Sequence, residues 1–428
     1  MQKHEWINNA EKTDVLVKDK KFWSHLSEAA YPITKGEMRI PISLEPFTIK
    51  KNEYDTLSRD LSFLISAAKK LAQAYYTDHE VAEVLAIDES EKELIVQAQN
   101  YDFTGIVRVD LFFADSPRVV EINSDYPDGF FMHDVTANAL QEFLPSNTSN
   151  TKSHLESFSD LLLEKKITKN AHIFIGFDRE RTFIDDFYLT KIKLESLGWK
   201  NISVGSLEDL DFKNSSFYYN EMKIDVLRRG SELSKIREMA NFIPKILEAE
   251  KNGLIVINNF KMRLLGYKSL MAALWDRRFS KYLNRSEIEA IEKILPKTYK
   301  LNTIKKETLI SEKDTWVIKP IDLAEGTNVF VGQSCTDEEW ISALHKAYSN
   351  STKWIVQEKV RIPKTTFNLV EDNHSKISSY ERGYDCNPHI ILMKDKIELG
   401  KILVRFSDSQ VVNVAKGGGI TYAFPGEN

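Results

Sequence analysis

Four polar side chains, two on each strand of an expected hairpin over residues 105–123, have the types and spacing of a cation site. Arg108 and Asp110 stand two residues apart in the first apolar run, and Glu121 and Asn123 stand two apart in the second. Because side chains two apart in a strand share a face, each pair projects to one side. Carboxylate and amide oxygens suit Mg²⁺, which proteins usually hold together with substrate phosphates.

The pairing across the hairpin decides whether these side chains converge. With a turn centred between residues 115 and 116, Asp110 lies opposite Glu121 and Arg108 lies opposite Asn123, with opposed Cβ atoms roughly 5 Å apart. Two opposed carboxylates repel each other unless a cation or a proton intervenes. The spacing is therefore compatible with a metal site, and Arg108 either neutralises the two carboxylates or binds a phosphate or carboxylate. A solvated polar face with a structural salt bridge is the alternative.

A lysine at the end of an apolar strand is the second feature. Lys319 closes the run W-V-I-K-P, and a loop over residues 321–329 that contains Gly326 follows it. Such a lysine can hold a phosphate while backbone N–H groups of the loop approach the same anion. The loop lacks the G-x-x-x-x-G-K-[ST] pattern of a Walker A motif. A solvated strand-end lysine is the commoner role and remains open.

Further candidates stand in other segments of the chain. Gln357 and Glu358 end a buried strand, whose edge can offer backbone groups to a base and a carboxylate to a ribose. Lys268 begins a helix, where an exposed helical lysine is the alternative. Arg405 lies on an expected strand, and Gly417–Gly419 permit close backbone approach or form a plain loop.

The elements that must position these residues follow from hydrophobic periodicity. Residues 52–76 carry apolar side chains at spacings of three and four, the pattern of an amphipathic helix, and residues 79–98 predict one or two more helices. Strands that alternate with helices favour a parallel α/β layer. They are expected at residues 171–177, 202–204, 224–227 and 254–257, with a further short apolar run at 217–219 and helices at 154–165 and 181–197. Arg228 and Arg229 follow one of these strands, where either binds an anionic substrate or lies at the surface.

The last third of the chain has a different pattern. Helices at 267–276 and 286–293 precede strands that predict an α+β region with a mainly antiparallel sheet. The strands are expected at residues 316–320, 327–331, 354–358, 389–393, 397–406 and 410–414.

Composition sets the broad class of the protein. The chain has 428 residues, 42% hydrophobic and 28% charged, which suits about two or three globular domains. The net charge of −5 argues against a general nucleic-acid binder. Apolar runs of about 18 residues and a signal-peptide core are both missing, so we expect a soluble, cytoplasmic protein without a membrane partner. Cys335 and Cys386 are expected to be reduced thiols.

The order of the motifs resembles that of a known enzyme family. R-V-D and E-I-N come first, then the α/β layer, then G-Y-K-S-L-M-A-A-L-W, V-I-K-P-I-D-L-A-E-G-T-N-V, I-V-Q-E, an arginine strand and G-G-G. This order resembles the circularly permuted ATP-grasp ligases, and within them the synthetase domain of glutathionylspermidine synthetase. Eukaryotic glutathione synthetase is a more distant relation. The resemblance covers roughly residues 100–428.

The resemblance implies a fold and a domain plan. We expect a mixed α+β and α/β chain with a circularly permuted ATP-grasp, antiparallel sheets and an inserted Rossmann-like layer that precedes the nucleotide-binding part. Residues 1–165 would hold an N-terminal helical segment and the metal-binding hairpin. Residues 168–260 would form the Rossmann-like domain, and residues 261–428 the nucleotide-binding part with its lid.

The resemblance also implies site residues. It assigns Asp110, Glu121 and Asn123 to Mg²⁺, Arg108 and Arg405 to the catalytic centre, Lys268 and Lys319 to the nucleotide phosphates, Gly326 and Gly418 to the loops that close over the nucleotide, and Gln357 and Glu358 to the adenine and ribose. The hairpin and the two lysines should then belong to one site.

The implied activity is ATP-dependent joining of a carboxylate to an amine through an acyl phosphate. The cofactors would be ATP and Mg²⁺, and the partners a small-molecule or peptide carboxylate and an amine. A non-catalytic ATP-binding protein and a small-molecule kinase are the alternatives. The segment S-D-Y-P-D-G-F-F after E-I-N departs from the synthetases, and no Cys/His amidase pattern precedes the hairpin. The substrates and the oligomeric state stay open.

Overall fold

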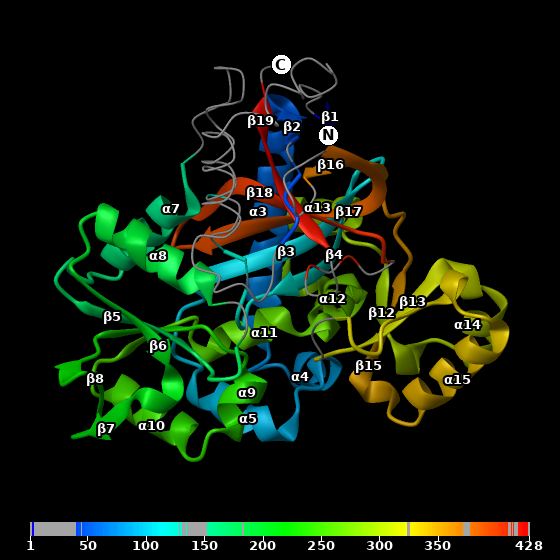
Figure 1. Ribbon diagram of the computed structural model, residues 1–428. Coiled ribbons are helices and arrows are strands. Elements are labelled where there is room, and N and C mark those ends of the chain that lie inside the picture. The colour runs from blue at the N-terminus through cyan, green and yellow to red at the C-terminus, as the bar shows by residue number, and fades with distance from the viewer. Residues whose placement is uncertain are drawn as a thin grey trace.

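The structure is a computed structural model, drawn in Figure 1. It describes residues 2–3, 40–43, 45–127, 129–130, 134, 152–181, 184–322, 326–370, 377–409, 412, 414 and 418–426. Gly417 and residues 323–325 of the loop before Gly326 lie outside these ranges. Within them, no helix has the length and apolar character needed to cross a lipid bilayer.

The largest sheet joins strands from distant parts of the chain. Its strands pair in the order β1-β2-β19-β18-β17-β3-β4, and β16 also pairs with β17. All these pairings are antiparallel except that of β2 with β19. The strands are β1 (Gln2–Lys3), β2 (Phe47–Lys50), β3 (Gly105–Phe113), β4 (Pro117–Asn123), β16 (Lys364–Val370), β17 (Ile377–Leu392), β18 (Ile397–Ser407) and β19 (Gly419–Gly426).

One face of this sheet is apolar and packs against helix α3 (Lys51–Ala74), which passes behind the strands in Figure 1. Val107 and Val109 of β3 are fully buried in the same core as Leu61 of the helix. Alternate residues of the strand thus meet the apolar stripe of the helix. The helix predicted over residues 52–76 is confirmed, and the polar residues between the valines face the other side of the sheet.

Two short helices follow α3 in the region where one or two were expected. They are α4 (His79–Leu85) and α5 (Glu89–Gln97). Asp78 and Asp88 accept hydrogen bonds from the first-turn N–H groups of these helices, which explains why each helix begins where it does.

The predicted parallel layer is present. Four strands pair in parallel in the order β11-β10-β5-β6. They are β5 (His172–Phe177), β6 (Asn201–Ser206), β10 (Val226–Arg229) and β11 (Ile255–Ile257), and the nearby helices are α7 (His154–Glu164), α8 (Asp185–Ser196), α9 (Leu233–Glu238) and α10 (Phe242–Lys251). The apolar run at 217–219 belongs instead to a small antiparallel sheet of β7 (Asp211–Lys213), β8 (Ser216–Tyr219) and β9 (Met222–Lys223).

A third, antiparallel sheet lies on the opposite side of the molecule from the parallel layer in Figure 1. Its order is β12-β15-β13-β14, with β12 (Thr298–Lys300), β13 (Trp316–Pro320), β14 (Phe330–Val331) and β15 (Trp354–Glu358). Trp340 of helix α15 (Asp337–Tyr348) shares a buried core with Ile318 and Val356 of this sheet. The remaining helices are α11 (Arg263–Gly266), α12 (Lys268–Trp275), α13 (Arg285–Ile294), α14 (Lys306–Ser311) and α15 (Asp337–Tyr348).

The β3–β4 hairpin has the predicted pairs but not the predicted turn. Asp110 lies opposite Glu121, as expected, but the hairpin ends with Phe113 opposite Pro117, which centres the turn on Asp115. The register shifts by one residue because Val120 forms a bulge between the pairs Asp110–Glu121 and Leu111–Val119. The bulge restores the register at the polar residues.

The C-terminal part of the largest sheet differs from the expectation. The strand predicted over residues 410–414 is wrong, since Val412 and Val414, its described residues, lie in no strand. The last strand is β19, and Gly419, predicted to belong to a loop, is its first residue. The strand predicted over 389–393 is part of the much longer β17, and the strand expected at 327–331 is shortened to β14.

Candidate functional site

The face of the largest sheet that points away from α3 carries a set of polar side chains from four neighbouring strands. Cross-strand pairs place Arg108 opposite both Asn123 and His389, and Asp385 opposite Arg405. The pairs His389–Arg108 and Cys386–Leu111 also bring Asn387 opposite Asp110. We call this set, together with the two lysines that reach it, the sheet-face cluster. It comprises Arg108, Asp110, Glu121, Asn123, Asp385, Asn387, His389, Arg405, Lys268 and Lys319.

Asp110 lies at the centre of the cluster between two arginines. Arg108 donates from Nε to Oδ1 of Asp110 (2.7 Å) and from Nη2 to Oδ2 (3.0 Å). Arg405 donates from Nη2 to Oδ2 of Asp110 (3.2 Å) and to Oδ2 of Asp385 (2.6 Å). Burial opposes ionisation of Asp110, but the two guanidinium groups outweigh it and hold the pKa of Asp110 below its usual range.

Asp385 shares Arg405 with Asp110, but its pKa is shifted in the opposite direction. Complete burial raises the pKa of the Asp385 carboxyl, Arg405 opposes that rise, and the neighbouring charge of Asp110 adds to it. The pKa values of two carboxyl groups that share one guanidinium are therefore shifted in opposite directions. Such divergence between neighbouring acids is typical of functional sites.

Lys268 reaches the hairpin from the first residue of α12. Its Nζ lies 2.8 Å from Oε1 of Glu121, and its side chain is only 6% exposed. The alternative of an exposed helical lysine is therefore wrong. The backbone of Lys268 is held in place because its N–H donates to the carbonyl of Ile321, which follows the strand of Lys319.

Lys319 approaches the same hairpin from the third sheet. Its Nζ donates to the carbonyl of Val120 (2.9 Å), the bulged residue of β4, and to Oε1 of Gln357 (2.8 Å). The residue is only 6% exposed, so a solvated strand cap is excluded. Burial lowers the pKa of Lys319 to about 8; Glu121 opposes this shift and Lys268 adds to it. The expected convergence of the two lysines on the hairpin is confirmed.

The other predicted residues surround this centre at varying distances. Gln357 is buried and donates to the hydroxyl of Thr298 (2.9 Å), so it links Lys319 to β12. Glu358, at the end of β15, lies 3.6 Å from the guanidinium of Arg118 on the hairpin and is partly exposed. Gly326 adopts a positive φ of 70° in the turn before β14, a conformation that favours glycine.

Gly418 is buried directly before β19, beside the strand of Arg405. The neighbouring Gly419 is closely packed, since an added Cβ would lie 2.3 Å from the Phe406 ring. This part of the glycine run is therefore a packed strand entry rather than an open loop.

The expected Mg²⁺ ligands can be compared with what the site offers. Asp110, Glu121 and Asn123 present hard oxygen atoms on one face, as Mg²⁺ requires, and Nδ2 of Asn123 is buried with no hydrogen-bond partner. The donor set fits in kind. Both carboxylates are at present neutralised by arginines and by Lys268, and the described residues contain no group of three or more His, Cys, Asp or Glu that would hold a metal alone.

Three residues of the sheet-face cluster were not predicted from the sequence. Asp385, Asn387 and His389 alternate along β17 and are almost completely buried. Their period-two spacing was a usable signal. Pro388 interrupts it, and proline normally argues against an internal strand; here the register of β17 with β18 shifts at this residue.

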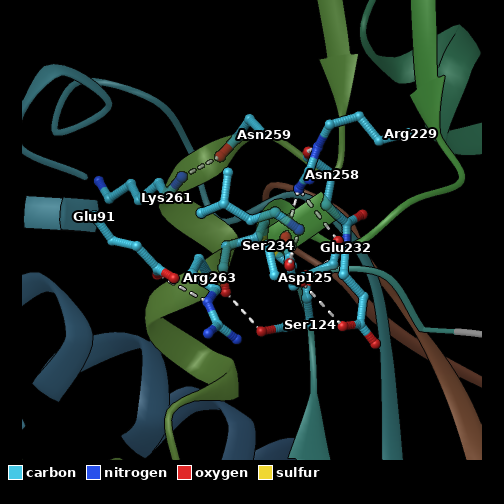
Figure 2. A network of polar contacts seen from close by, with 12 residues as sticks. Glu91, Ser124, Asp125, Arg229, Glu232, Ser234, Asn258, Asn259, Lys261 and Arg263 are labelled. Atoms are coloured by element: carbon cyan, nitrogen blue, oxygen red, sulfur yellow. Dashed lines mark hydrogen bonds and ion pairs between the residues drawn. The ribbon is translucent and has the colours of Figure 1, made fainter. Parts of the chain in front are cut away.

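A second ionic network joins the end of β4 to the parallel layer (Figure 2). Arg229 donates to Oδ1 of Asp125 (2.8 Å) and to the carbonyl of Asn258 (2.9 Å). The other oxygen of Asp125 accepts from the N–H of Leu233 (2.8 Å). Arg263 donates to Glu91 (3.0 Å) nearby. We call Asp125, Arg229, Asn258, Arg263 and Glu91 the junction network.

Asn258 shows what this network does. Its side-chain amide bonds the N–H and the carbonyl of Ile106 on β3 (2.9 and 2.7 Å) and the carbonyl of Ser124 after β4 (2.7 Å). One asparagine thereby holds both strands of the hairpin. The junction network fixes the hairpin that carries the sheet-face cluster.

Comparison with known proteins gives a likeness in fold. No family model and no curated protein matches the sequence. Among solved structures, the chain is similar to a glutathione synthetase-like effector from Globodera pallida, with a TM-score of 0.62, 13% identity, and coverage of 96% of this chain and 97% of that one. At this identity the likeness concerns the fold alone.

Two other solved structures are less similar. A candidate γ-glutamylcysteine synthetase from Methylobacillus flagellatus has a TM-score of 0.40, 11% identity, and coverage of 82% of this chain and 84% of that one. D-alanyl-alanine synthetase A from Vibrio cholerae has a TM-score of 0.29, 9% identity, and coverage of 58% and 93%. The mixed α+β chain, with several antiparallel sheets, shares its overall fold with the Globodera pallida effector alone among these three.

Proposed function

We propose that this protein is an ATP-dependent carboxylate–amine ligase that forms an amide bond and releases ADP and phosphate. The observation that carries the proposal is the convergence of two buried lysines, from separate segments, on the hairpin that holds Asp110 and Glu121. The fold of the glutathione synthetase-like effector is in keeping with it.

The lysines are proposed to hold the nucleotide phosphates. Lys319 is buried and bonded to two neutral oxygens rather than to a carboxylate. A buried cation without an acid gains strongly from an added anion. Lys268 would exchange its bond to Glu121 for a bond to phosphate.

Glu121, released from Lys268, would then hold Mg²⁺ with Asp110 and Asn123. The bound ion would shield the negative charge of the phosphate oxygens. The hard oxygens of these three side chains support the assignment.

Arg108 and Arg405 are proposed to face the reacting groups. A carboxylate oxygen of the acid attacks the γ-phosphorus, the bond to the bridging oxygen breaks, and ADP leaves with that oxygen. The amine nitrogen then attacks the acyl carbon, loses a proton, and displaces inorganic phosphate. Both steps concentrate negative charge, which the paired guanidinium groups beside Asp110 are placed to stabilise.

The remaining assignments complete the nucleotide site. Gln357 and Glu358 would meet the adenine and the ribose from the end of β15, while Gly326 and Gly418 would exclude water from the acyl phosphate. In this proposal the largest sheet and the third sheet form a circularly permuted ATP-grasp, and the parallel layer over residues 168–260 is its inserted Rossmann-like domain.

The test is an ADP-release screen over panels of acids and amines, with products read by mass spectrometry. The proposal expects ADP release that needs both an acid and an amine, with a product lighter by one water than the two together. ADP release with a single substrate and a phosphorylated product would identify a kinase. ATP binding without ADP release in any mixture would identify a non-catalytic protein.

A further inference from the structure

One buried carboxyl group lies outside both polar clusters and has no cation paired with it. Oε2 of Glu250 is buried without a hydrogen-bond partner, and no ion pair joins Glu250 to a basic group within the described ranges. Glu250 stands in the last turn of α10, where the carbonyl groups of the helix end disfavour a negative charge. Burial and helix position therefore both oppose ionisation of this carboxyl.

The surroundings of Glu250 are mainly apolar. Its neighbour Ala249 lies in a buried core together with Ala98 of α5 and Val256 of β11. Tyr101 packs at the edge of this core, and its hydroxyl hydrogen-bonds the Glu250 carboxyl. The Glu250–Tyr101 contact thus joins α10 of the parallel layer to the chain that follows α5.

Tyr101 belongs to the short segment that leads from α5 into β3. Its carbonyl accepts a hydrogen bond from Nζ of Lys261 (2.7 Å), and the carbonyl of Asp102 accepts one from Nδ2 of Asn259 (3.0 Å). The segment is therefore held against the parallel layer by its main chain as well as by the Tyr101 hydroxyl. Since β3 carries part of the sheet-face cluster, these contacts hold the approach to that cluster.

The charged groups around Glu250 balance its carboxyl poorly. Burial raises the pKa of Glu250 to about 7, while the Tyr101 hydroxyl and Arg229 oppose the rise. Arg229 acts from beyond ion-pair distance, and its own bonds go to Asp125 and the Asn258 carbonyl (Figure 2). Charged groups of the other elements near α10 are engaged elsewhere: Lys235 with Glu180 and Glu238, Arg237 with Glu91, Lys213 with Glu221, Glu93 with Gln97, Lys245 with the Phe212 ring, and Glu248 with Ser215.

We propose that Glu250 and Tyr101 form a proton-controlled latch between the parallel layer and the segment that enters β3. While the carboxyl holds its proton, it is a neutral acceptor for the Tyr101 hydroxyl and is compatible with the apolar core. When the proton is lost, a buried negative charge needs water, and the end of α10 and the Tyr101 segment separate more often to admit it. The protein thus holds the approach to β3 more firmly below neutral pH than above it. This inference is independent of the proposed function.

Hydrogen exchange followed by mass spectrometry tests the latch in the full chain. Rates in peptides from α10 and from residues 97–104 are compared between wild type and Glu250→Gln at the same pH, which cancels the chemical pH dependence of exchange. Between the ordinary carboxyl pKa of 4.5 and about 7, the folded state holds a proton that the opened state has lost, so opening becomes easier as pH rises. We expect the ratio of wild-type to variant rates to rise about tenfold or more from pH 5 to pH 8, and to level off above about pH 7.

Two further variants make the test specific. Glu248→Gln changes the exposed acid two residues earlier on α10, and its ratio to wild type should not vary with pH. Tyr101→Phe removes a donor that favours the ionised carboxyl, so the pH at which its rates, referred to Glu250→Gln, level off should move upward. A ratio for Glu250→Gln that stays constant from pH 5 to 8 would overturn the proposal. So would an equal rise in peptides of α15, which would indicate a change in the whole fold, or a levelling pH that Tyr101→Phe leaves unmoved.

Discussion

The sheet-face cluster and the junction network both contain buried arginines and carboxylates at the β3–β4 hairpin, yet their bonding differs. In the junction network each arginine bonds a carboxylate, Arg229 with Asp125 and Arg263 with Glu91. In the sheet-face cluster Lys319 is buried without a carboxylate partner and its pKa falls to about 8. Two acids there, Asp110 and Asp385, share Arg405.

The difference between the two regions indicates where binding of an added ion would be favourable. Charges that are paired within the protein hold segments together, and an added ion gains little from them. The sheet-face cluster differs, because Lys319 has no carboxylate partner and the pKa values of Asp110 and Asp385 are shifted in opposite directions. An added anion would gain from such a cation. We therefore interpret the junction network as a structural clamp, and we propose that the sheet-face cluster is a binding site.

The largest expected effect is loss of activity without loss of fold. Glu121→Ala should reduce ADP release by about a thousandfold or more, because it removes a proposed metal ligand from the reacting centre. Circular dichroism should change little, and the unfolding midpoint should fall less than in Asp125→Ala, since the Glu121 side chain is partly exposed and water can reach the position it leaves. The control is Glu89→Ala on the exposed side of α5, with unchanged turnover. Normal turnover by Glu121→Ala would remove Glu121 from the proposed site.

A substitution in the junction network should reduce the stability of the protein. Asp125→Ala leaves Arg229 buried without its acid, which should lower the free energy of unfolding by about 3–5 kcal/mol. Denaturant unfolding measures this change. Asp115→Ala removes an equally short ion pair to Arg361, but an exposed one, and should cost less than about 1 kcal/mol. Equal costs for the two variants would show that the junction network is not a clamp.

The pH dependence of ATP binding should report on Lys319. Its pKa of about 8 lies below the ordinary value of 10.5, so it loses its proton, and with it the charge for phosphate, as pH rises past about 8. We expect ATP affinity to fall by up to about tenfold per pH unit there. Lys319→Arg should bind with little change to pH 9.5, because arginine stays charged. A wild-type affinity that is constant up to pH 9.5 would contradict the assignment.

The smallest expected effect is on stability. Lys319→Met should change the free energy of unfolding by only about 1 kcal/mol at pH 7, since it removes a buried charge that no acid balances and retains most of the side-chain volume. The same lowered pKa implies that in wild type this group adds stability as pH rises from 8, because the unfolded chain then binds the extra proton. Denaturant unfolding at pH 7 and 9.5, compared between wild type and the variant, checks both statements.

Local periodicity predicted much of the framework. The alternation of Arg108 and Asp110 with buried valines gave the polar face of β3 and its pairing with β4. The bulge at Val120 was not predictable, because one extra residue in a strand leaves the hydrophobic pattern almost intact. Its carbonyl is nevertheless what Lys319 bonds.

Tertiary context decided what periodicity could not. The burial of Lys268 and Lys319 depends on three segments meeting, and a single lysine after a strand carries no sign of that. Asp385 was missed because Pro388 indicates a loop before residue 389, although β17 continues through it. The pairing of β17 with β18 places Asp385 opposite Arg405, and the pairing of β17 with the distant strand β3 brings Arg405 within reach of Asp110.

The central claim, that the sheet-face cluster binds a nucleotide, is tested most directly by calorimetric titration of ATP with Mg²⁺ into wild type and Lys319→Met at pH 7. We expect one ATP per wild-type chain and a dissociation constant about a hundredfold higher in the variant, from the loss of a buried charge-assisted contact. Equal affinity of the two proteins for ATP, with both correctly folded, would contradict the account.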